Sequence, residues 1–278
     1  MSEENNEFGF GCLPGKIDLR DYKIKREVAM AYNYPETFSL DHPPVKNQGA
    51  VGSCVAHATS EILESHLKEY KKLSTNFLYG IHYKLFGSKG PGMYLREACK
   101  IAKDYGDPEE IFCKGNTEVP HVYSMAENSF KDPSVLENAN KYKINSYVKL
   151  RTENDIKYSL MYHGPVLISV EWFSDYEFKY STGILSPGVK SAGLHCIMIY
   201  GWNEDGWLCQ NSWGELWGKN GCFVLPYTYE INEAYALISD PSRDDINKVK
   251  RCKFLDFMYK ILNNLINWFV DVFRWLKK

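Results

Sequence analysis

The 278-residue sequence carries almost no net charge, and this excludes one broad class of partner. Its 33 lysine and arginine residues nearly balance 35 aspartate and glutamate residues, for a formal net charge of −2. Proteins that bind nucleic acid usually carry a strong basic excess, because phosphate contacts dominate the affinity. We therefore expect no nucleic-acid partner.

The sequence also lacks several features of secreted and metal-binding proteins. It has no N-x-S/T glycosylation site, no C-x-x-C pair, and no apolar segment within Met1–Phe10 that resembles a secretory signal. Cys54 and His57 are spaced as C-x-x-H, but nothing nearby offers further ligands. We expect no metal or other cofactor, a reducing compartment, and a cytoplasmic or membrane-associated location.

The chain is organised around one stretch, residues 44–58, with the sequence PVKNQGAVGSCVAHA. It reads as a glycine-containing loop followed by a helix, with Ser53 as a fair N-cap. Cys54 then lies in the first helical turn, where free backbone N–H groups and the helix dipole favour a thiolate. Gln48 precedes it by six residues, and its side-chain amide is suited to donate to an oxyanion beside that thiol.

Two further residues complete a plausible catalytic set much later in the chain. His195 opens a strand-like run that ends at Trp202, and Asn211 follows 16 residues after His195. A helix-borne cysteine with a distant histidine and asparagine is the arrangement that thiol-based nucleophilic catalysis uses. Histidine accepts the thiol proton, and asparagine orients the other ring nitrogen.

These blocks resemble the papain family of cysteine peptidases, over about residues 34–239. The resemblance rests on PVKNQG at residues 44–49, GSC at residues 52–54, His195, and NSWG at residues 211–214 followed by Trp217 and Gly218. It implies catalytic roles for Gln48, Cys54, His195 and Asn211. The pattern is closer to bacterial and viral members of the family than to lysosomal ones.

The resemblance also suggests supporting residues. Trp213 is expected to shield the bond between histidine and asparagine, and Trp217 to line the leaving-group side of the cleft. Gly92 resembles a family glycine that offers backbone groups to the substrate, although Met93 stands where a second glycine is usual. Gly193 should leave the main specificity pocket roomy enough for a bulky apolar side chain.

The sequence departs from the family pattern at four positions around the site. Val51 and Val55 stand where the family usually has a cysteine and an aromatic residue, so one structural disulfide is missing. Leu194 replaces a frequent Asp, Asn or Gly, and Cys196 replaces a frequent Ala. These changes alter the wall of the cleft and leave the four catalytic side chains in place.

The order of the predicted elements indicates an α+β protein with two lobes and the active site in the cleft between them. The helical lobe contains a helix from Cys54 to about Lys72 and another over 94–105. Residues 121–150 read as a connecting surface segment, and Thr152 caps a short helix. An antiparallel, barrel-like lobe follows, with strands expected at 166–171, 195–202, 207–211, 221–225 and 235–239. Cys196, Cys209 and Cys222 fall on successive strands and should be buried.

The two ends of the chain lie outside this peptidase domain, 34–239. Residues 1–33 form a short extension, interpreted either as an autoinhibitory propeptide in the cleft or as an arm packed on the surface. Residues 240–252 read as a linker. Residues 253–278 show polar positions every three or four residues, which predicts an amphipathic helix with a broad apolar face. Trp268 and Trp275 belong to that apolar face.

This C-terminal helix leaves three interpretations open. Residues 248–278 carry eight Lys or Arg and two Asp, and a basic amphipathic helix suits the surface of a membrane. Packing against a partner or a second copy is the next interpretation, and folding back onto the body is the third. The polar stripe argues against a transmembrane span.

The predicted reaction is hydrolysis of peptide bonds in peptide or protein substrates, through an acyl-enzyme on Cys54. Two alternatives remain at this stage. One is a catalytically silent papain-like protein that binds peptides or a partner. The other is a thiol acyltransferase, because an amine can attack the same acyl-enzyme as water does.

Overall fold

The computed structural model describes residues 9–15, 33–67, 69–87, 91–114 and 130–239. The chain divides into two units, residues 1–239 and 240–278, and the second lies outside the described residues. The predicted linker 240–252 and the predicted helix 253–278 therefore stay predictions. Within the described ranges, no helix is both long and apolar enough to cross a membrane.

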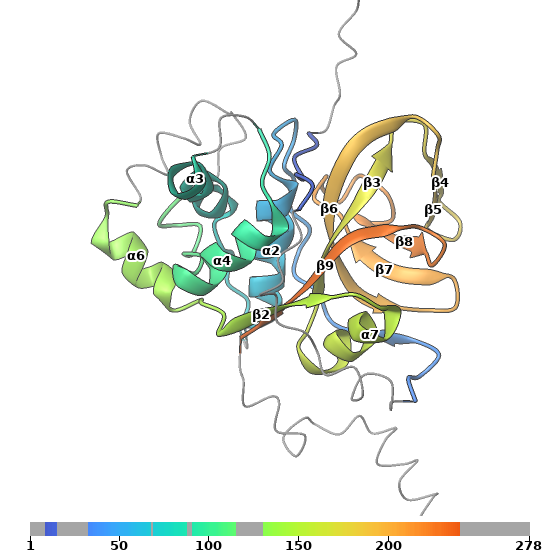
Figure 1. Ribbon diagram of the computed structural model, residues 1–278, viewed down its shortest axis with the longest axis horizontal. Coiled ribbons are helices and arrows are strands. Elements are labelled where there is room, and N and C mark those ends of the chain that lie inside the picture. Colours follow the sequence, from blue (N-terminus) through green and yellow to red (C-terminus); the bar gives the residue numbers. More distant parts are fainter. Residues whose placement is uncertain (1–8, 16–32, 68, 88–90, 115–129, 240–278) are drawn as a thin grey trace, which may run out of the picture. The chain divides into compact units, whose positions relative to one another are not determined.

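The described residues form five helices and nine strands, with most of the helices in the first half of the chain and most of the strands in the second. Figure 1 shows how these elements are arranged. The helices are α2 (Cys54–Ser65), α3 (Thr75–Phe86), α4 (Leu95–Asp104), α6 (Pro133–Asn140) and α7 (Glu153–Tyr162). The strands are β1 (Phe38–Ser39), β2 (Ser146–Leu150), β3 (Val166–Phe173), β4 (Glu177–Lys179), β5 (Ile184–Ser186), β6 (Ser191–Trp202), β7 (Gly206–Gln210), β8 (Cys222–Pro226) and β9 (Ile231–Ile238).

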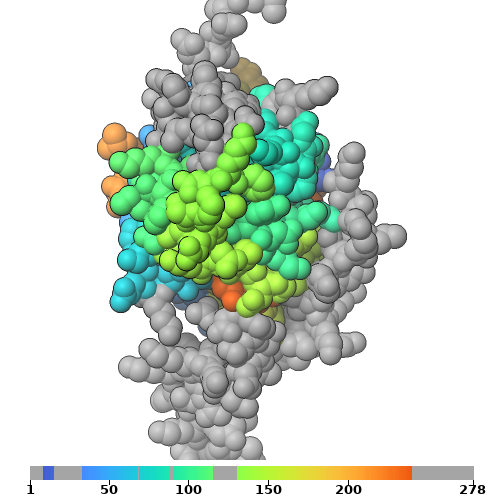
Figure 2. Space-filling model, turned by 90° about the vertical axis from the view of Figure 1, so that its left-hand side faces the viewer, coloured from blue at the N-terminus to red at the C-terminus, as the bar shows by residue number. Residues whose placement is uncertain are grey.

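Helices α2, α3, α4 and α6 form the helical lobe. Eleven of the twelve residues of α2 are buried, from Cys54 to Glu64, so this helix is the central element of the lobe. Helix α4 buries one face, including Leu95, Ala98 and Ile101, and leaves the other exposed. Helix α6 covers the outer side of the lobe (Figure 2). Helix α2 is therefore held from several sides, and its first residue has a fixed position.

The strands form one sheet in the order β2-β9-β3-β6-β7-β8-β5-β4, with β1 paired to β6. Every pairing is antiparallel except that of β5 with β8, which is parallel. Strand β6 lies in the middle, between β3 and β7. The observed α+β architecture with a helical lobe and a mainly antiparallel sheet lobe confirms the predicted fold class.

Strand β6 contributes side chains to the cores of both lobes, because successive residues point to opposite faces. Cys196 and Met198 belong to the core that β6 shares with α2 and α4, whereas Ile197 and Ile199 belong to the core inside the sheet. This period of two is the geometry of a strand with both faces buried. His195 packs with the aromatic rings of the second core. One strand thus fixes the histidine at the junction between the lobes.

Several element predictions from the sequence are corrected by the structure. The first helix ends at Ser65 rather than near Lys72, and α3 begins at Thr75 in a stretch for which no helix bounds were predicted. Residues 121–150 are more than a connecting segment, because their described part contains α6 and β2. The helix capped by Thr152 is confirmed as α7, with a reciprocal capping box to Asp155.

Candidate active site

Cys54 is the first residue of helix α2 and points into the junction between the lobes. Ser53 occupies the N-cap position, but its hydroxyl makes no capping bond and instead contacts Nδ1 of His57 at 3.2 Å. The backbone N–H groups of Cys54 and Val55 bond to the Cys54 sulfur and lower the pKa of the thiol, and so does the N–H of Cys196 from strand β6. The thiol at the helix start therefore meets the strand that carries His195.

His195 and Asn211 form the expected pair. Their side chains are joined by a bond of 2.8 Å between Nε2 of the histidine and Oδ1 of the asparagine. Asn211 follows strand β7, and its backbone N–H donates to the carbonyl of Gly221 at 2.9 Å, which fixes its position. A ring nitrogen facing a carbonyl oxygen must carry the proton, so Nδ1 of His195 is the nitrogen left to accept one.

Trp213 stacks on the histidine ring. The two ring centres are 4.7 Å apart and the planes differ by 30°. Trp172 of strand β3 meets both His195 and Trp213 edge-on, with ring centres 5.0 Å away in each case. The indoles exclude water from the bond between His195 and Asn211, which strengthens that bond by lowering the local dielectric.

Gln48 lies in the loop before α2 and is anchored to the segment that follows Asn211. Its backbone N–H donates to the carbonyl of Ser212 at 2.8 Å, and its Oε1 accepts from the Ser212 hydroxyl at 2.5 Å. Since Oε1 is occupied, the amide is oriented with Nε2 as the donor. That donor bonds the carbonyls of Gly9 and Val51, each at 2.8 Å.

Residues 9–13 cover this site. Gly9 donates to the Gly49 carbonyl at 3.0 Å, and Cys12 donates to the Leu194 carbonyl at 3.3 Å. The backbone N–H of Gly11 acts on the Cys54 thiol, and Phe10 meets the rings of His195 and Trp213 edge-on at 5.8 and 5.9 Å. This segment thereby contacts both lobes.

Glycine is required where the segment crosses the helix start. A side-chain carbon on Gly11 would lie 1.7 Å from the carbonyl oxygen of Gly52. One on Gly9 would lie 2.5 Å from the carbonyl oxygen of Ala50. These distances are far below van der Waals contact, so only glycine permits this approach.

Burial of the site shifts the pKa of both reacting groups. Cys54, His195 and Asn211 are fully buried, and Gln48 is 1% exposed. Burial raises the pKa of the Cys54 thiol to about 11, against the opposing effect of nearby backbone N–H groups. Burial likewise lowers the pKa of His195 to about 4, and the bond to Asn211 only partly offsets this. The thiolate predicted from the helix start is thus absent from the covered site, because loss of hydration outweighs the helix terminus.

The predicted substrate-binding residues are distributed around the covering segment. Gly92 lies against it, since a side-chain carbon there would be 2.9 Å from the Gly11 carbonyl. The backbone bonds to the segment come from Met93, whose N–H donates to Gly11 at 2.8 Å and whose carbonyl accepts from Leu13 at 3.1 Å. Gly193 faces open space, with no atom within 4 Å of an added side-chain carbon.

Trp217 packs against the rings of Trp213, Trp172 and Tyr176. Its ring centre is 5.2 Å from that of Trp213, and its indole N–H donates to the Tyr176 hydroxyl at 2.9 Å. Tyr176 and Trp172 were missed by the sequence reasoning, because no motif marks them. Ser212, which holds the Gln48 amide, lies inside the NSWG block and could have been identified from it.

The arrangement supports nucleophilic chemistry at a carbonyl group. It contains a thiol at a helix start, an oriented imidazole on the facing strand, and an amide donor aimed at the neighbouring space. Among the described residues, no group of three or more His, Cys, Asp or Glu side chains is arranged to hold a metal ion.

Comparison with known proteins agrees with this geometry. The family model described as "Papain family cysteine protease" matches residues 36–237. A "Cysteine protease" of Blomia tropicalis is 28% identical over 248 residues, which cover 80% of this chain and 70% of that protein. A "Viral cathepsin" of Heliothis zea nuclear polyhedrosis virus is 30% identical over 191 residues, covering 64% of this chain and 47% of the viral protein.

The fold has solved counterparts. The crystal structure of xylellain, a cysteine protease from Xylella fastidiosa, superposes with a TM-score of 0.70 at 20% identity, covering 84% of this chain and 97% of that one. The cysteine protease and lectin-like domains of Cwp84 from Clostridium difficile give a TM-score of 0.64 at 19% identity, covering 84% of this chain and 56% of that one.

Proposed function

Because this chain belongs to the papain family of cysteine proteases, we propose that it is an endopeptidase that residues 9–13 of its own chain keep inactive. The observation that carries the proposal is the occupation of the Gln48 donor by the carbonyl of Gly9, at 2.8 Å. The Cys54 thiol is fully buried in this structure, and the backbone N–H of Gly11 in the same segment bonds to it. A substrate carbonyl cannot reach either group while the segment is bound.

The reaction follows from the groups around the thiol. Nδ1 of His195 takes the proton from Cys54, while Asn211 keeps the other ring nitrogen protonated and oriented. The thiolate attacks the peptide carbonyl, and the developing oxyanion accepts bonds from the Gln48 amide and the Cys54 backbone N–H. His195 passes its proton to the leaving amine as a thioester forms. Water then hydrolyses the thioester and restores the thiol.

Departure of the segment would also activate the pair electrostatically. Burial is the main cause that raises the pKa of Cys54 and lowers that of His195. Water reaching the site removes that cause from both groups. The proton then moves from sulfur to nitrogen more readily, because the ion pair is hydrated and the helix start favours the thiolate.

Replacing Gly11 by valine is expected to open the site. The side chain would collide with the Gly52 carbonyl, and such overpacking raises the open population enough to speed labelling of Cys54 by at least about tenfold. The measurement is the rate at which a peptidyl epoxide modifies Cys54 in the full chain, mapped by mass spectrometry. Phe10→Ala, which removes the ring contacts to His195 and Trp213, should accelerate labelling in the same direction.

The control for this experiment is a similar collision far from the site. A side-chain carbon on Gly106, which follows helix α4, would lie 2.0 Å from the backbone carbonyl oxygen of Ala139 in helix α6, so Gly106→Val tests general destabilisation. Circular dichroism shows whether each variant is folded. Equal labelling rates in wild type, Gly11→Val and Phe10→Ala would contradict self-inhibition by this segment.

We propose separately that residues 253–278, which lie outside the described residues, bind the surface of an anionic membrane. The proposal is supported by the basic residues and the amphipathic spacing of this stretch. It implies a protein located in the cytoplasm or at a membrane surface. The substrate itself remains a peptide or protein, as the family requires.

Deleting residues 250–278 should abolish binding to vesicles that contain phosphatidylserine while leaving peptide hydrolysis intact. The measurement is co-sedimentation with such vesicles, compared with vesicles of neutral lipid at the same ionic strength. High salt should weaken the binding of the full chain, because the basic residues supply much of it. Undiminished sedimentation of the shortened chain with anionic vesicles would refute the proposal.

A further inference from the structure

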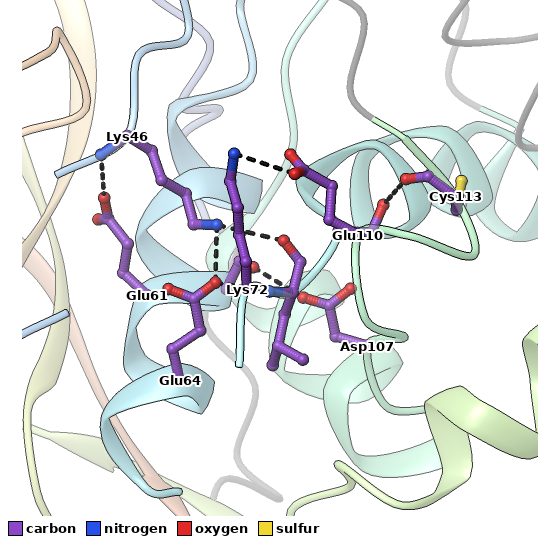
Figure 3. Close-up of polar contacts among 10 residues, drawn as sticks. Lys46, Glu61, Glu64, Lys72, Asp107, Glu110 and Cys113 are labelled. Carbon is purple, nitrogen blue, oxygen red and sulfur yellow. Dashed lines mark hydrogen bonds and ion pairs between the residues drawn. The ribbon is translucent and has the colours of Figure 1, made fainter. Parts of the chain in front are cut away.

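A group of buried acidic side chains surrounds Lys46 at helix α2 (Figure 3). Lys46 forms an ion pair with Glu64 of helix α2, with 2.7 Å between Nζ and Oε1. Asp107 accepts from the Ser60 hydroxyl at 2.8 Å. Glu61 and Asp107 are fully buried, and Glu64 is 2% exposed. Three carboxyl groups thus share the surroundings of one ammonium group.

Glu61 bonds the backbone of the loop that leads to Gln48. Its Oε1 accepts the backbone N–H of Lys46 at 3.1 Å, and Lys46 lies two residues before Gln48. A contact with a backbone amide fixes the chain itself; Glu64 fixes the chain at Leu73 in the same way, whereas Glu61 fixes it two residues before Gln48. Glu61 therefore ties helix α2, which carries Cys54, to the loop that carries the amide donor.

The Glu61 carboxyl lies near strand β7, which leads to Asn211. Gln210, the last residue of β7, lies close enough for its amide to influence the Glu61 carboxyl. Both amide atoms of Gln210 and Oε2 of Glu61 are buried without a hydrogen bond of good geometry. These groups are adjacent but misaligned, so small rotations complete or break the contact.

The protonation of Glu61 decides which contacts it can make. Burial raises its pKa to about 8, against the opposing effects of the Lys46 ammonium, the Lys46 N–H and Gln210. Glu64 raises it further, and the thiols of Cys196 and Cys222 also interact with Glu61 from β6 and β8. A neutral carboxyl group accepts from Lys46 and has a proton to donate to the Gln210 carbonyl. An ionised one only accepts.

We propose that Glu61 is a positioning residue for the peptidase reaction, which holds the Gln48 loop against helix α2 and reaches the Asn211 strand through Gln210. The inference deepens the peptidase function above and relies on it for the catalytic readout. Glu61 touches neither substrate nor reacting atoms. It acts by keeping the oxyanion donor and the histidine-orienting residue in register with the thiol, and its ionisation changes its contacts with the Lys46 N–H and with Gln210.

The first test uses the full wild-type chain and needs no turnover. Nuclear magnetic resonance should show the side-chain amide of Gln48 and the backbone N–H of Lys46 shifting with a midpoint near pH 8, where Glu61 ionises. Glu61→Gln, which mimics the neutral acid, should remove this transition from both signals. Asp107→Asn should retain it, because Asp107 makes its contact with Ser60 instead.

The second test is the pH profile of kcat/KM in the Gly11→Val background, where the site is open. The parent should show a step on the alkaline side near pH 8, where Glu61 ionises, and Glu61→Gln should lack this step. Glu61→Leu, which leaves the Lys46 N–H without its acceptor, should lower kcat at every pH with little change in KM. Asp107→Asn keeps the alkaline step of the parent.

A stability measurement separates this role from a merely structural one. Burial raises the pKa of both Glu61 and Asp107, so each holds a proton that the unfolded chain has lost. For Glu61, the free energy of unfolding should therefore fall as the pH rises from about 4.5 to 8. Both Glu61→Gln and Asp107→Asn should flatten that fall, but only Glu61→Gln should alter the Gln48 signal and the rate profile.

Two outcomes would overturn the inference. One is a Gln48 signal that does not titrate near pH 8 in the wild type. The other is an alkaline step of kcat/KM that is the same in Glu61→Gln and Asp107→Asn. If the Gly11→Val background shows no peptidase activity at all, the proposed function fails, while the Gln48 signal still decides whether Glu61 positions the loop.

Discussion

Cys54→Ala is expected to abolish peptide hydrolysis, with a loss of kcat on the order of 10⁵-fold or more. The thiol sulfur is the atom that bonds to the substrate carbonyl, and alanine offers no substitute nucleophile. The assay is turnover of a fluorogenic peptide, measured in the Gly11→Val background so that the covering segment does not mask the result.

The matched control removes a different buried thiol. Cys99 lies in helix α4, is fully buried, and belongs to the core of the helical lobe. Cys99→Ala should lower stability slightly and leave the turnover of the folded protein intact. Substantial hydrolysis by Cys54→Ala would mean that another group is the nucleophile, and the catalytic assignment would then be wrong.

Gln48→Ala should lower kcat by about 10²- to 10³-fold, the usual cost of removing one oxyanion donor. The change also removes the bond to the Gly9 carbonyl, so the covering segment should bind less tightly. Alkylation of Cys54 by iodoacetamide, which forms no oxyanion, should therefore become faster in the full chain. Turnover and labelling are expected to change in opposite directions.

Asn47→Ala provides the comparison for Gln48. Asn47 lies in the same loop, where its side chain accepts from the backbone N–H of Gly49 at 2.9 Å at an exposed site. Its loss should change kcat by no more than about twofold, as expected for surface substitutions. If Gln48→Ala slows turnover and labelling equally, the residue acts by holding the loop and not as an oxyanion donor.

The local elements with strong sequence signals were predicted correctly. The helix beginning at Cys54 follows from apolar spacing after a glycine-containing loop, and α7 follows from the capping box of Thr152 and Asp155. Strand β6 is readable because a continuous apolar run follows His195. Each of these signals lies within about ten residues, so it can be recognised from the sequence without tertiary information.

The errors occur where distant residues decide the local structure. The first helix was predicted to reach Lys72, but both backbone groups of Leu73 are bound by side chains from elsewhere. Its N–H donates to Glu64 at 2.6 Å, and its carbonyl accepts from Nζ of Lys46 at 3.2 Å. Lys46 and Glu64, which form an ion pair with each other, thus hold the chain at Leu73 beside α2. Strand β2 was missed for a similar reason, since its partner β9 follows about 85 residues later.

The sequence by itself predicted which side chains would do the chemistry. Cys54, His195, Asn211 and Gln48 are recognised from local blocks and their order along the chain. Only the tertiary structure decided the state in which they are held. Burial raises the pKa of the thiol and lowers that of the imidazole, and residues 9–13, about 40 positions before Cys54, are among the segments packed against them. Hydration depends on what packs against a group in space, and neighbours in sequence do not specify it.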